Sequence, residues 1–234
     1  MTNTGKIYGV SLGPGDPDLI TLKGLNTLEK VDKIYFPGSL YADGTQLSYA
    51  MSILEHYKLE SSKMQGFYLE MDLERVQAKR VYETTYQLIK KDYENGLSIA
   101  VVSEGDLNTF SSFSYILEKI LSDKLSVSLV PGITSYAMGA AENLTPLCLQ
   151  NDRLLIIPRV QTEEQLQEAL DNFDTVVLMK IKSVIPVLDA VLSKKVYSIN
   201  YSEKLGTTAQ FTTSNWEEIT QREIPYFSLI TIQK

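Results

Sequence analysis

The sequence predicts an α/β protein of two domains, and three observations support this fold class. Apolar runs typical of strands alternate with helix-like periodic segments in the first part of the chain, which is the pattern of βαβ units and a mainly parallel sheet. A second series of strands and helices follows a connector. The length of 234 residues is enough to bury two cores. We therefore expect domains at residues 1–134 and 135–234, with a linking helix and connector over about 134–150.

The N-terminal domain is predicted to contain a mainly parallel five-stranded sheet, with strands at 6–12, 33–37, 67–69, 99–102 and 126–130. Pro37 and Gly38 are expected to end the second strand. Helices are expected to start at Thr21, to span 46–57 and 72–95, and to start near Ser111 or Ser112, and a small-residue helix follows at 137–141. Helical periodicity predicts that the inward residues are Leu22, Leu25, Leu28 and Val31; Leu47, Met51 and Leu54; Leu73, Val76, Val81, Leu88 and Ile89; and Phe113, Ile116, Leu117, Ile120 and Leu121.

The C-terminal domain is predicted to contain a mixed sheet. Its expected strands are 154–157, 175–179, 196–199, 210–213 and 227–232. Thr162 and Gln165 have the spacing of a capping box at the start of one helix. A second helix is expected at 184–192, where Pro186 is tolerated because it lies in the first turn.

Composition excludes several classes of protein. The formal net charge of −7 is a poor match for a protein that binds a phosphate backbone, so we expect no nucleic acid partner. No apolar run approaches the roughly 20 residues that span a bilayer, and no signal peptide is visible. Cys148 and His56 are the single residues of their types, which rules out an internal disulfide and argues against a zinc site or a Ser-His-Asp triad. We expect a cytoplasmic protein without a metal.

Three predicted strands of the first domain end in glycine loops. These loops are Gly13-Pro14-Gly15, Glu104-Gly105-Asp106 and Pro131-Gly132. None of them has the spacing of a P-loop or a dinucleotide fingerprint. Each can be a plain structural turn, but ligands of open α/β sheets lie at the carboxyl ends of strands, and glycine lets a ligand approach the backbone closely. Three such loops together predict one shared ligand cleft.

At the level of motifs, the chain resembles the tetrapyrrole methylase family, whose members use S-adenosylmethionine. The residues that carry the resemblance are VSLGPGDPDLITLKG (10–24), VVSEGDLNTFSSFSY (101–115), LVPGITSYAMGAA (129–141), VVLMK (176–180), SEKLGT (202–207) and YFSLITI (226–232). The resemblance covers nearly the whole chain and is strongest to the group that methylates C20 of precorrin-2 or cobalt-factor II in corrin biosynthesis. It implies two domains with a cleft between them, a tetrapyrrole substrate and a homodimer.

The resemblance also implies which residues form the site. The expected contacts of the cofactor are Pro14, Glu104, Gly105, Asp106, Thr109, Thr134, Ser135, Met179, Asn200 and Ser228. Asp106 is the first candidate for a base that removes the proton from the methylated carbon. Its backbone is expected to hold the cofactor while its side chain faces the substrate. The alternative role of Asp106 is that of an ionised partner for the cofactor or for the pyrrole N–H groups of the substrate. Lys180 is expected to pair with a substrate carboxylate. Further candidates for that pairing are Lys182, Arg153, Arg159, Arg75, Lys79 and Arg80.

Two departures from the family pattern and two rival functions remain open. The family's Gly-Asp-Pro is Gly105-Asp106-Leu107 here, and Leu107 lacks the fixed φ of proline, so we expect a less rigid loop. The usual tyrosine is Phe110, which keeps the aromatic face without the hydroxyl. The rivals are methylation of another tetrapyrrole carbon and a non-catalytic module that binds S-adenosylmethionine.

Overall fold

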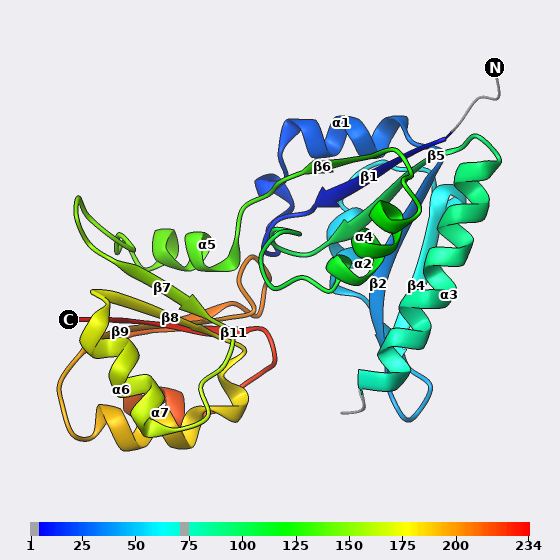
Figure 1. Cartoon of the computed structure of the whole chain (residues 1–234). Coiled ribbons are helices and arrows are strands. Elements are labelled where there is room, and N and C mark those ends of the chain that lie inside the picture. Colours follow the sequence, from blue (N-terminus) through cyan, green and yellow to red (C-terminus); the bar gives the residue numbers. More distant parts are fainter. Residues whose placement is uncertain (1–4, 71–74) are drawn as a thin grey trace. The chain divides into compact units, whose positions relative to one another are not determined.

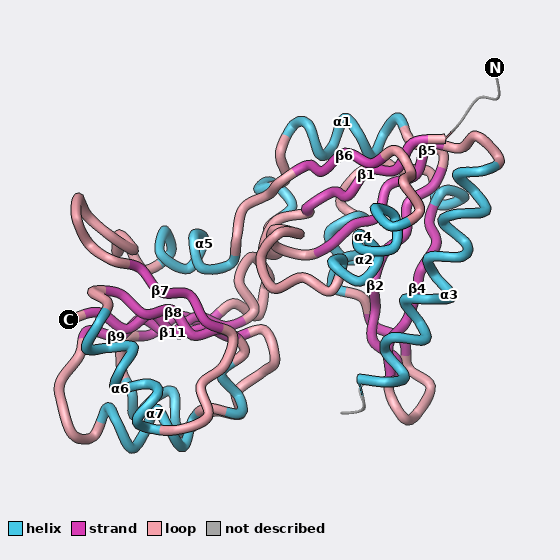
Figure 2. Tube along the Cα trace, viewed as in Figure 1, coloured by secondary structure: helices cyan, strands magenta, loops and turns pink. Residues whose placement is uncertain are grey.

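The chain folds into two compact units, Met1–Thr134 and Ser135–Lys234, each with its own sheet (Figures 1 and 2). The computed structural model describes residues 5–70 and 75–234, and leaves the side chains of residues 75–77 outside the description. Both units combine helices with a sheet, so the predicted α/β fold class is confirmed.

The first unit contains a six-stranded sheet. Its strands are β1 (Lys6–Ser11), β2 (Lys33–Leu40), β3 (Gln46–Leu47), β4 (Met64–Glu70), β5 (Ser98–Ser103) and β6 (Val127–Val130). Its helices are α1 (Leu22–Lys30), α2 (Tyr49–Leu54), α3 (Arg75–Glu94) and α4 (Phe113–Ser122), with short 3₁₀ turns η1 (Pro17–Leu19) and η2 (Ser61–Lys63). Five strands are parallel, as predicted, and they lie in the order β4–β2–β5–β1–β6. The short β3 runs antiparallel to the end of β2.

Both faces of this sheet are covered, as expected for a parallel sheet whose crossover helices lie on its faces. Helices α1 and α2 pack on one face, where Leu28 and Leu54 lie against Val10 of β1 and its neighbours. Helices α3 and α4 pack on the other face, where Ile89 and Ile116 join the core.

Several local predictions for this unit are wrong. Leu22 was predicted to point inward but is 81% exposed, because the buried face of α1 contains Gly24, Leu28 and the C-cap Val31. Glycine has no apolar side chain, so the hydrophobic pattern did not indicate that Gly24 lies on the buried face. Leu47 is 57% exposed, because 46–47 forms β3 and α2 starts only after the cap Ser48.

Three further corrections concern α3, α4 and β2. Helix α3 buries Tyr82, Tyr86 and Ile89 and leaves Leu88 exposed; Leu73 and the side chain of Val76 lie outside the described residues. Leu121 of α4 is also exposed. Strand β2 continues through Pro37 to Leu40, because β5 pairs with β2 only as far as Tyr35 and β4 carries the pairing onward.

The second unit contains a mixed five-stranded sheet, as predicted. Its strands β7 (Leu154–Ile157), β8 (Thr175–Met179), β9 (Ser198–Glu203), β10 (Phe211–Thr213) and β11 (Ser228–Gln233) lie in the order β10–β9–β11–β8–β7, in which only β7 and β8 are parallel. Its helices are α5 (Ser135–Glu142), α6 (Glu163–Asn172), α7 (Ile185–Leu192) and α8 (Trp216–Thr220), with a 3₁₀ turn η3 (Ile181–Ser183). Helix α8 is not predicted by the periodicity.

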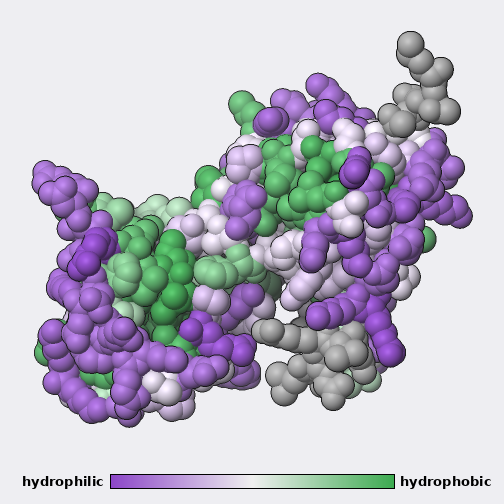
Figure 3. Space-filling model, viewed as in Figure 1, coloured by the Kyte–Doolittle hydropathy of each residue, from purple (hydrophilic) through white to green (hydrophobic). Residues whose placement is uncertain are grey.

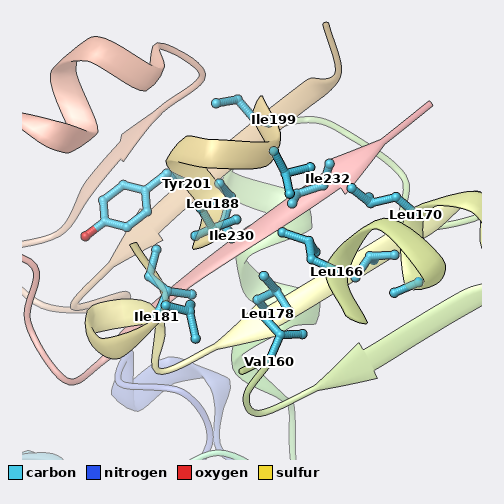
Figure 4. Close-up of a cluster of buried hydrophobic side chains, with 14 of the residues drawn as sticks. Val160, Leu166, Leu170, Leu178, Ile181, Leu188, Ile199, Tyr201, Ile230 and Ile232 are labelled. Carbon is cyan, nitrogen blue, oxygen red and sulfur yellow. The ribbon is translucent and has the colours of Figure 1, made fainter. Parts of the chain in front are cut away.

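Most of the apolar residues of this unit lie on one face of its sheet. Leu166 and Leu170 of α6 and Leu188 of α7 pack on Leu178, Ile230 and Ile232 (Figure 4). On the opposite face, Gly139 of α5 lies close to Leu229 and Ser202, so the small residues of α5 permit contact with the sheet. Figure 3 shows hydrophobic residues also at the surface over the edge strands β6 and β7, whose side chains are mostly half-buried.

Candidate functional site

Three loops of the first unit meet where neighbouring strands end. Strand β1 lies between β5 and β6, and all three strands are parallel, so the loops that follow them emerge at the same edge of the sheet. The chain leaves β1 toward β2 on one side, and leaves β5 toward β6 on the other. This reversal of direction is the topological switch point at which open α/β sheets bind ligands.

Direct contacts join the three loops. The backbones of Gly13 and Gly105 exchange two hydrogen bonds, of 3.1 Å and 2.6 Å. Gly132 packs so closely that a Cβ atom there would lie 2.5 Å from the Cβ of Ser11. The glycine loops predicted to share a site therefore form a single cluster.

The Asp106 carboxylate lies inside this cluster. The side chain is 9% exposed. Its Oδ2 accepts the N–H of Gly132 at 2.8 Å, and its Oδ1 accepts the N–H of Asn108 at 2.9 Å. The hydroxyl of Ser11 makes a longer contact of 3.4 Å with Oδ2. Through these contacts the carboxylate joins the end of β1 to the loops that follow β5 and β6. The expectation that this side chain faces a substrate and acts as a catalytic base stays a prediction.

The two departures from the family pattern have different structural consequences. Leu107 is 4% exposed, packs in the core below the loop, and donates its N–H to the hydroxyl of Ser11 at 2.9 Å. The loop therefore gains a side-chain anchor in place of the constraint that proline would impose. Phe110 is 44% exposed and has a positive φ of 52°, so its ring lies at the surface of the loop.

The other predicted cofactor residues of this unit surround the cluster. Pro14 is buried beside Gly13, and Thr109 is half-buried with its N–H bonded to the carbonyl of Asp106. Glu104 accepts the N–H of Ala50, at the start of α2, at 3.2 Å. Thr134 follows β6, and it ends the first unit.

The backbone at Gly105 is unobstructed on the side where a side chain would stand. Its φ of +65° lies in the left-handed region, and a Cβ built there would meet nothing within 4 Å. The conformation favours glycine, and the space beside it is open. Because the N–H and the carbonyl of Gly105 are both hydrogen-bonded to Gly13, the open side of this turn is the Cα face of Gly105.

In the second unit the structure brings only part of the predicted set together. Met179 pairs with Leu229 and Asn200 pairs with Thr231, so both side chains share the face of the sheet on which α5 packs. The side chain of Ser228 points to the opposite face and donates to the carbonyl of Pro225. Ser135 is the first residue of α5.

The basic residues predicted to bind the substrate lie at different ends of the second sheet. Lys180 follows β8, has a positive φ of 57°, and places Nζ 5.0 Å from the ring centre of Tyr226. Arg159 follows β7, which is parallel to β8, so these two residues lie at the same end. Arg153 precedes β7 and lies at the other end, and Lys182 pairs with Glu223 at 3.7 Å. In the first unit, Lys79 and Arg80 are exposed on α3, whereas the side chain of Arg75 is not described.

Two polar groups inside the motifs were not predicted to belong to the site. One is Ser11, whose hydroxyl bonds to the Asp106 turn. The other is Glu203, which is 3% exposed and pairs with Arg222 at 2.7 Å. Tyr201 donates its hydroxyl to Glu203, and burial and then this hydrogen bond raise the pKa of Tyr201 above its usual value. Glu203 follows Ser202 in the SEKLGT motif, so that motif was the available signal.

The described residues contain neither a group of metal ligands nor a membrane-spanning helix. Within 5–70 and 75–234, no three His, Cys, Asp or Glu residues are grouped so that they could hold a metal ion. In the same ranges, no helix is both long and apolar enough to cross a membrane.

Comparison with known proteins identifies the family. The family model described as "Tetrapyrrole (Corrin/Porphyrin) Methylases" matches residues 6–220. The chain therefore belongs to the tetrapyrrole methylase family and is a methyltransferase, which confirms the resemblance predicted from the motifs.

Several relatives match most of the chain. A probable cobalt-precorrin-2 C(20)-methyltransferase of Methanocaldococcus jannaschii is 31% identical over 194 residues, which cover 83% of this chain and 80% of the relative. A cobalt-precorrin-2 C(20)-methyltransferase of Salmonella typhimurium is 28% identical, with coverage of 98% and 97%. A precorrin-2 C(20)-methyltransferase of Sinorhizobium sp. is 26% identical, with coverage of 97% and 95%.

Solved structures support the fold. A cobalt precorrin-4 methyltransferase has a TM-score of 0.72 at 18% identity, covering 97% of this chain and 94% of that chain. A uroporphyrin-III C-methyl transferase of Thermus thermophilus, solved in complex with S-adenyl homocysteine, has a TM-score of 0.66 at 17% identity and covers 98% of both chains.

Proposed function

We propose that the protein is an S-adenosylmethionine-dependent methyltransferase that acts on C20 of precorrin-2 or cobalt-factor II in corrin biosynthesis. One observation carries this proposal: three relatives from three organisms match most of their own length and share the C(20) specificity in their names. The methyl donor is S-adenosylmethionine, as the motifs predicted.

The cluster of glycine loops supports the position of the cofactor on the first unit. We assign the open Cα face of Gly105 and the neighbouring Thr109 to cofactor binding, with Pro14, Glu104 and Thr134 around them. From the second unit we retain Ser135, Met179 and Asn200 as side-chain contacts and Ser228 as a backbone contact. When bound, S-adenosylmethionine supplies an electrophilic methyl group. The chain's contribution is then to hold that group and the substrate carbon in line, which is worth several kcal/mol, up to about 7–11 in well-oriented systems.

Lys180 and Arg159 are assigned to the substrate. A tetrapyrrole of this pathway carries many acetate and propionate groups, and the protein has a net charge of −7, so binding requires local cations. Both residues follow parallel neighbouring strands at one end of the second sheet. Arginine and lysine at this end can each bind a substrate carboxylate.

Incubation with S-adenosylmethionine labelled at its methyl carbon tests the proposal. Precorrin-2 and cobalt-factor II are supplied separately, and the product is analysed by NMR for the labelled carbon. Label at C20 supports the proposal, and the better substrate decides between the metal-free and the cobalt form. Label at another carbon supports the rival specificity within the family. Binding of S-adenosylmethionine without methyl transfer to any tetrapyrrole refutes the enzyme and leaves the binding module.

A homodimer and a cytoplasmic location belong to the same proposal. In the connector between α5 and β7, Leu144 is 90% exposed and Leu149 is 62% exposed, so this connector is the first segment to test for a contact between subunits. Sedimentation velocity tests the dimer, and replacement of Leu144 by glutamate tests whether this connector takes part in it. Fractionation of cells tests the location.

A further inference from the structure

Ser11 is buried directly beneath the turn assigned to the cofactor. It is the last residue of β1 and is 0% exposed. Its hydroxyl accepts the N–H of Leu107 at 2.9 Å and approaches Oδ2 of Asp106 at 3.4 Å as a donor. One hydroxyl thus contacts two consecutive residues of the loop that follows β5.

The turn itself explains why this contact matters. The N–H of Thr109 donates to the carbonyl of Asp106 at 3.1 Å, which closes a four-residue turn with Leu107 in its second position. Proline is favoured in that position because it fixes φ and needs no hydrogen-bond partner for its nitrogen. Leucine brings an N–H into a buried place, where an unpaired donor destabilises the structure. The Ser11 hydroxyl satisfies this donor.

We propose that Ser11 is a positioning residue that holds the 104–109 turn in place for the cofactor through the N–H of Leu107. The inference rests on the proposed function, since it concerns the same cofactor turn. Ser11 acts through Leu107 and Asp106, the two residues that follow Gly105 in the turn.

The first test compares two variants that each lose one buried hydroxyl from the first unit. Ser11→Ala removes the contact to the turn, and Tyr35→Phe removes a hydrogen bond of 2.7 Å to Asp92 of α3, which is not part of the turn. Calorimetric titration with S-adenosylhomocysteine should show about tenfold weaker binding for Ser11→Ala. The KM for S-adenosylmethionine should rise by a similar factor with a smaller change in kcat, and Tyr35→Phe should bind as the wild type does. Equal affinity of Ser11→Ala and wild type overturns the inference.

The second test removes the donor in place of the acceptor. Leu107→Pro takes away the N–H and is compatible with the second position of the turn. Ser11→Ala should therefore weaken binding much less in the Leu107→Pro background than in the wild type, and a double-mutant cycle cancels the packing lost with the leucine side chain. The same tenfold loss in both backgrounds overturns the inference.

Two outcomes separate this inference from the proposed function. If the wild type binds no S-adenosylhomocysteine, the proposed function fails, and the inference fails with it. If the wild type binds but Ser11→Ala binds equally well, the inference alone fails. If Ser11→Ala does not fold, the double variant Ser11→Ala/Leu107→Pro should fold and bind S-adenosylhomocysteine, because it leaves no buried N–H without a partner at residue 107. A double variant that is also unfolded overturns the inference.

Discussion

The replacement of Asp106 by asparagine and by alanine separates a structural role of this carboxylate from a catalytic one. The carboxylate accepts two backbone N–H groups, from Gly132 at 2.8 Å and from Asn108 at 2.9 Å. Hydrogen bonds to a charged group contribute about 1.5–3 kcal/mol each. Asn108 is exposed, so water can replace one of the two bonds, and we expect Asp106→Ala to lose about 2–4 kcal/mol of unfolding free energy.

Asparagine should have an intermediate effect. Its single carbonyl oxygen can keep the bond to Gly132, while its amide group faces the N–H of Asn108, which is next to solvent. We expect a loss of about 1–2 kcal/mol from this variant. Because the carboxylate joins the loops that hold the cofactor, affinity for S-adenosylhomocysteine and kcat/KM should fall together, in the order wild type, Asp106→Asn, Asp106→Ala.

Urea unfolding, calorimetric titration and a methyl-transfer assay on the same preparations measure the three quantities. Asp123→Asn serves as the control, because Asp123 binds Tyr86 and Lys90 on the helical face of the same unit. It should lose stability and keep cofactor affinity. If Asp106→Asn kept both stability and affinity but lost about 10²–10⁴-fold in kcat, Asp106 would be the base, and the structural interpretation would be refuted.

Three further predictions concern other parts of the two units. Gly105→Ala and Gly44→Ala place a Cβ in open space at φ of +65° and +84°, so each variant should lose about 1 kcal/mol of stability. Only Gly105→Ala should weaken the binding of S-adenosylhomocysteine. Equal affinities of the two variants in calorimetry would remove Gly105 from the cofactor site. The hydroxyl and then the N–H of Ser98 hold the pKa of Asp32 below its usual value of 3.8, so the ionised carboxylate adds stability above pH 3.8, and this stability is lost as the pH falls through the folded pKa. Asp32→Asn should therefore unfold at lower urea concentration than the wild type at pH 6 and differ little from it in strong acid. A constant difference in stability at both pH values would contradict this prediction. Arg159→Ala should raise the KM for the tetrapyrrole about tenfold or more, whereas Arg153→Ala at the other end of the strand should leave it unchanged, and steady-state kinetics in which both variants behave alike would exclude the assignment.

Local chemistry in the sequence determined most of the elements. Alternating strands and helices specified the α/β class, because the two kinds of element space their apolar residues with different periods. Short-range signals were also sufficient to predict where several helices begin or end. Thr21 caps the start of α1, Thr162 caps the start of α6, and Gly96 adopts a positive φ just after the end of α3. The motifs were sufficient for the family.

Tertiary structure alone decided where side chains point and which loops meet. Leu22 fits the period of α1, yet Gly24 faces the sheet, because the packing of the helix on Val10 selects the buried face. Asp106 occupies the expected turn, but the position of Gly132, distant in sequence, turns its carboxylate inward. The bond from Leu107 to Ser11 joins residues 96 positions apart, and only the pairing of β1 with β5 brings them together. A pattern of residues specifies local structure, whereas the partner of a buried polar group depends on strand order, which no local signal contains.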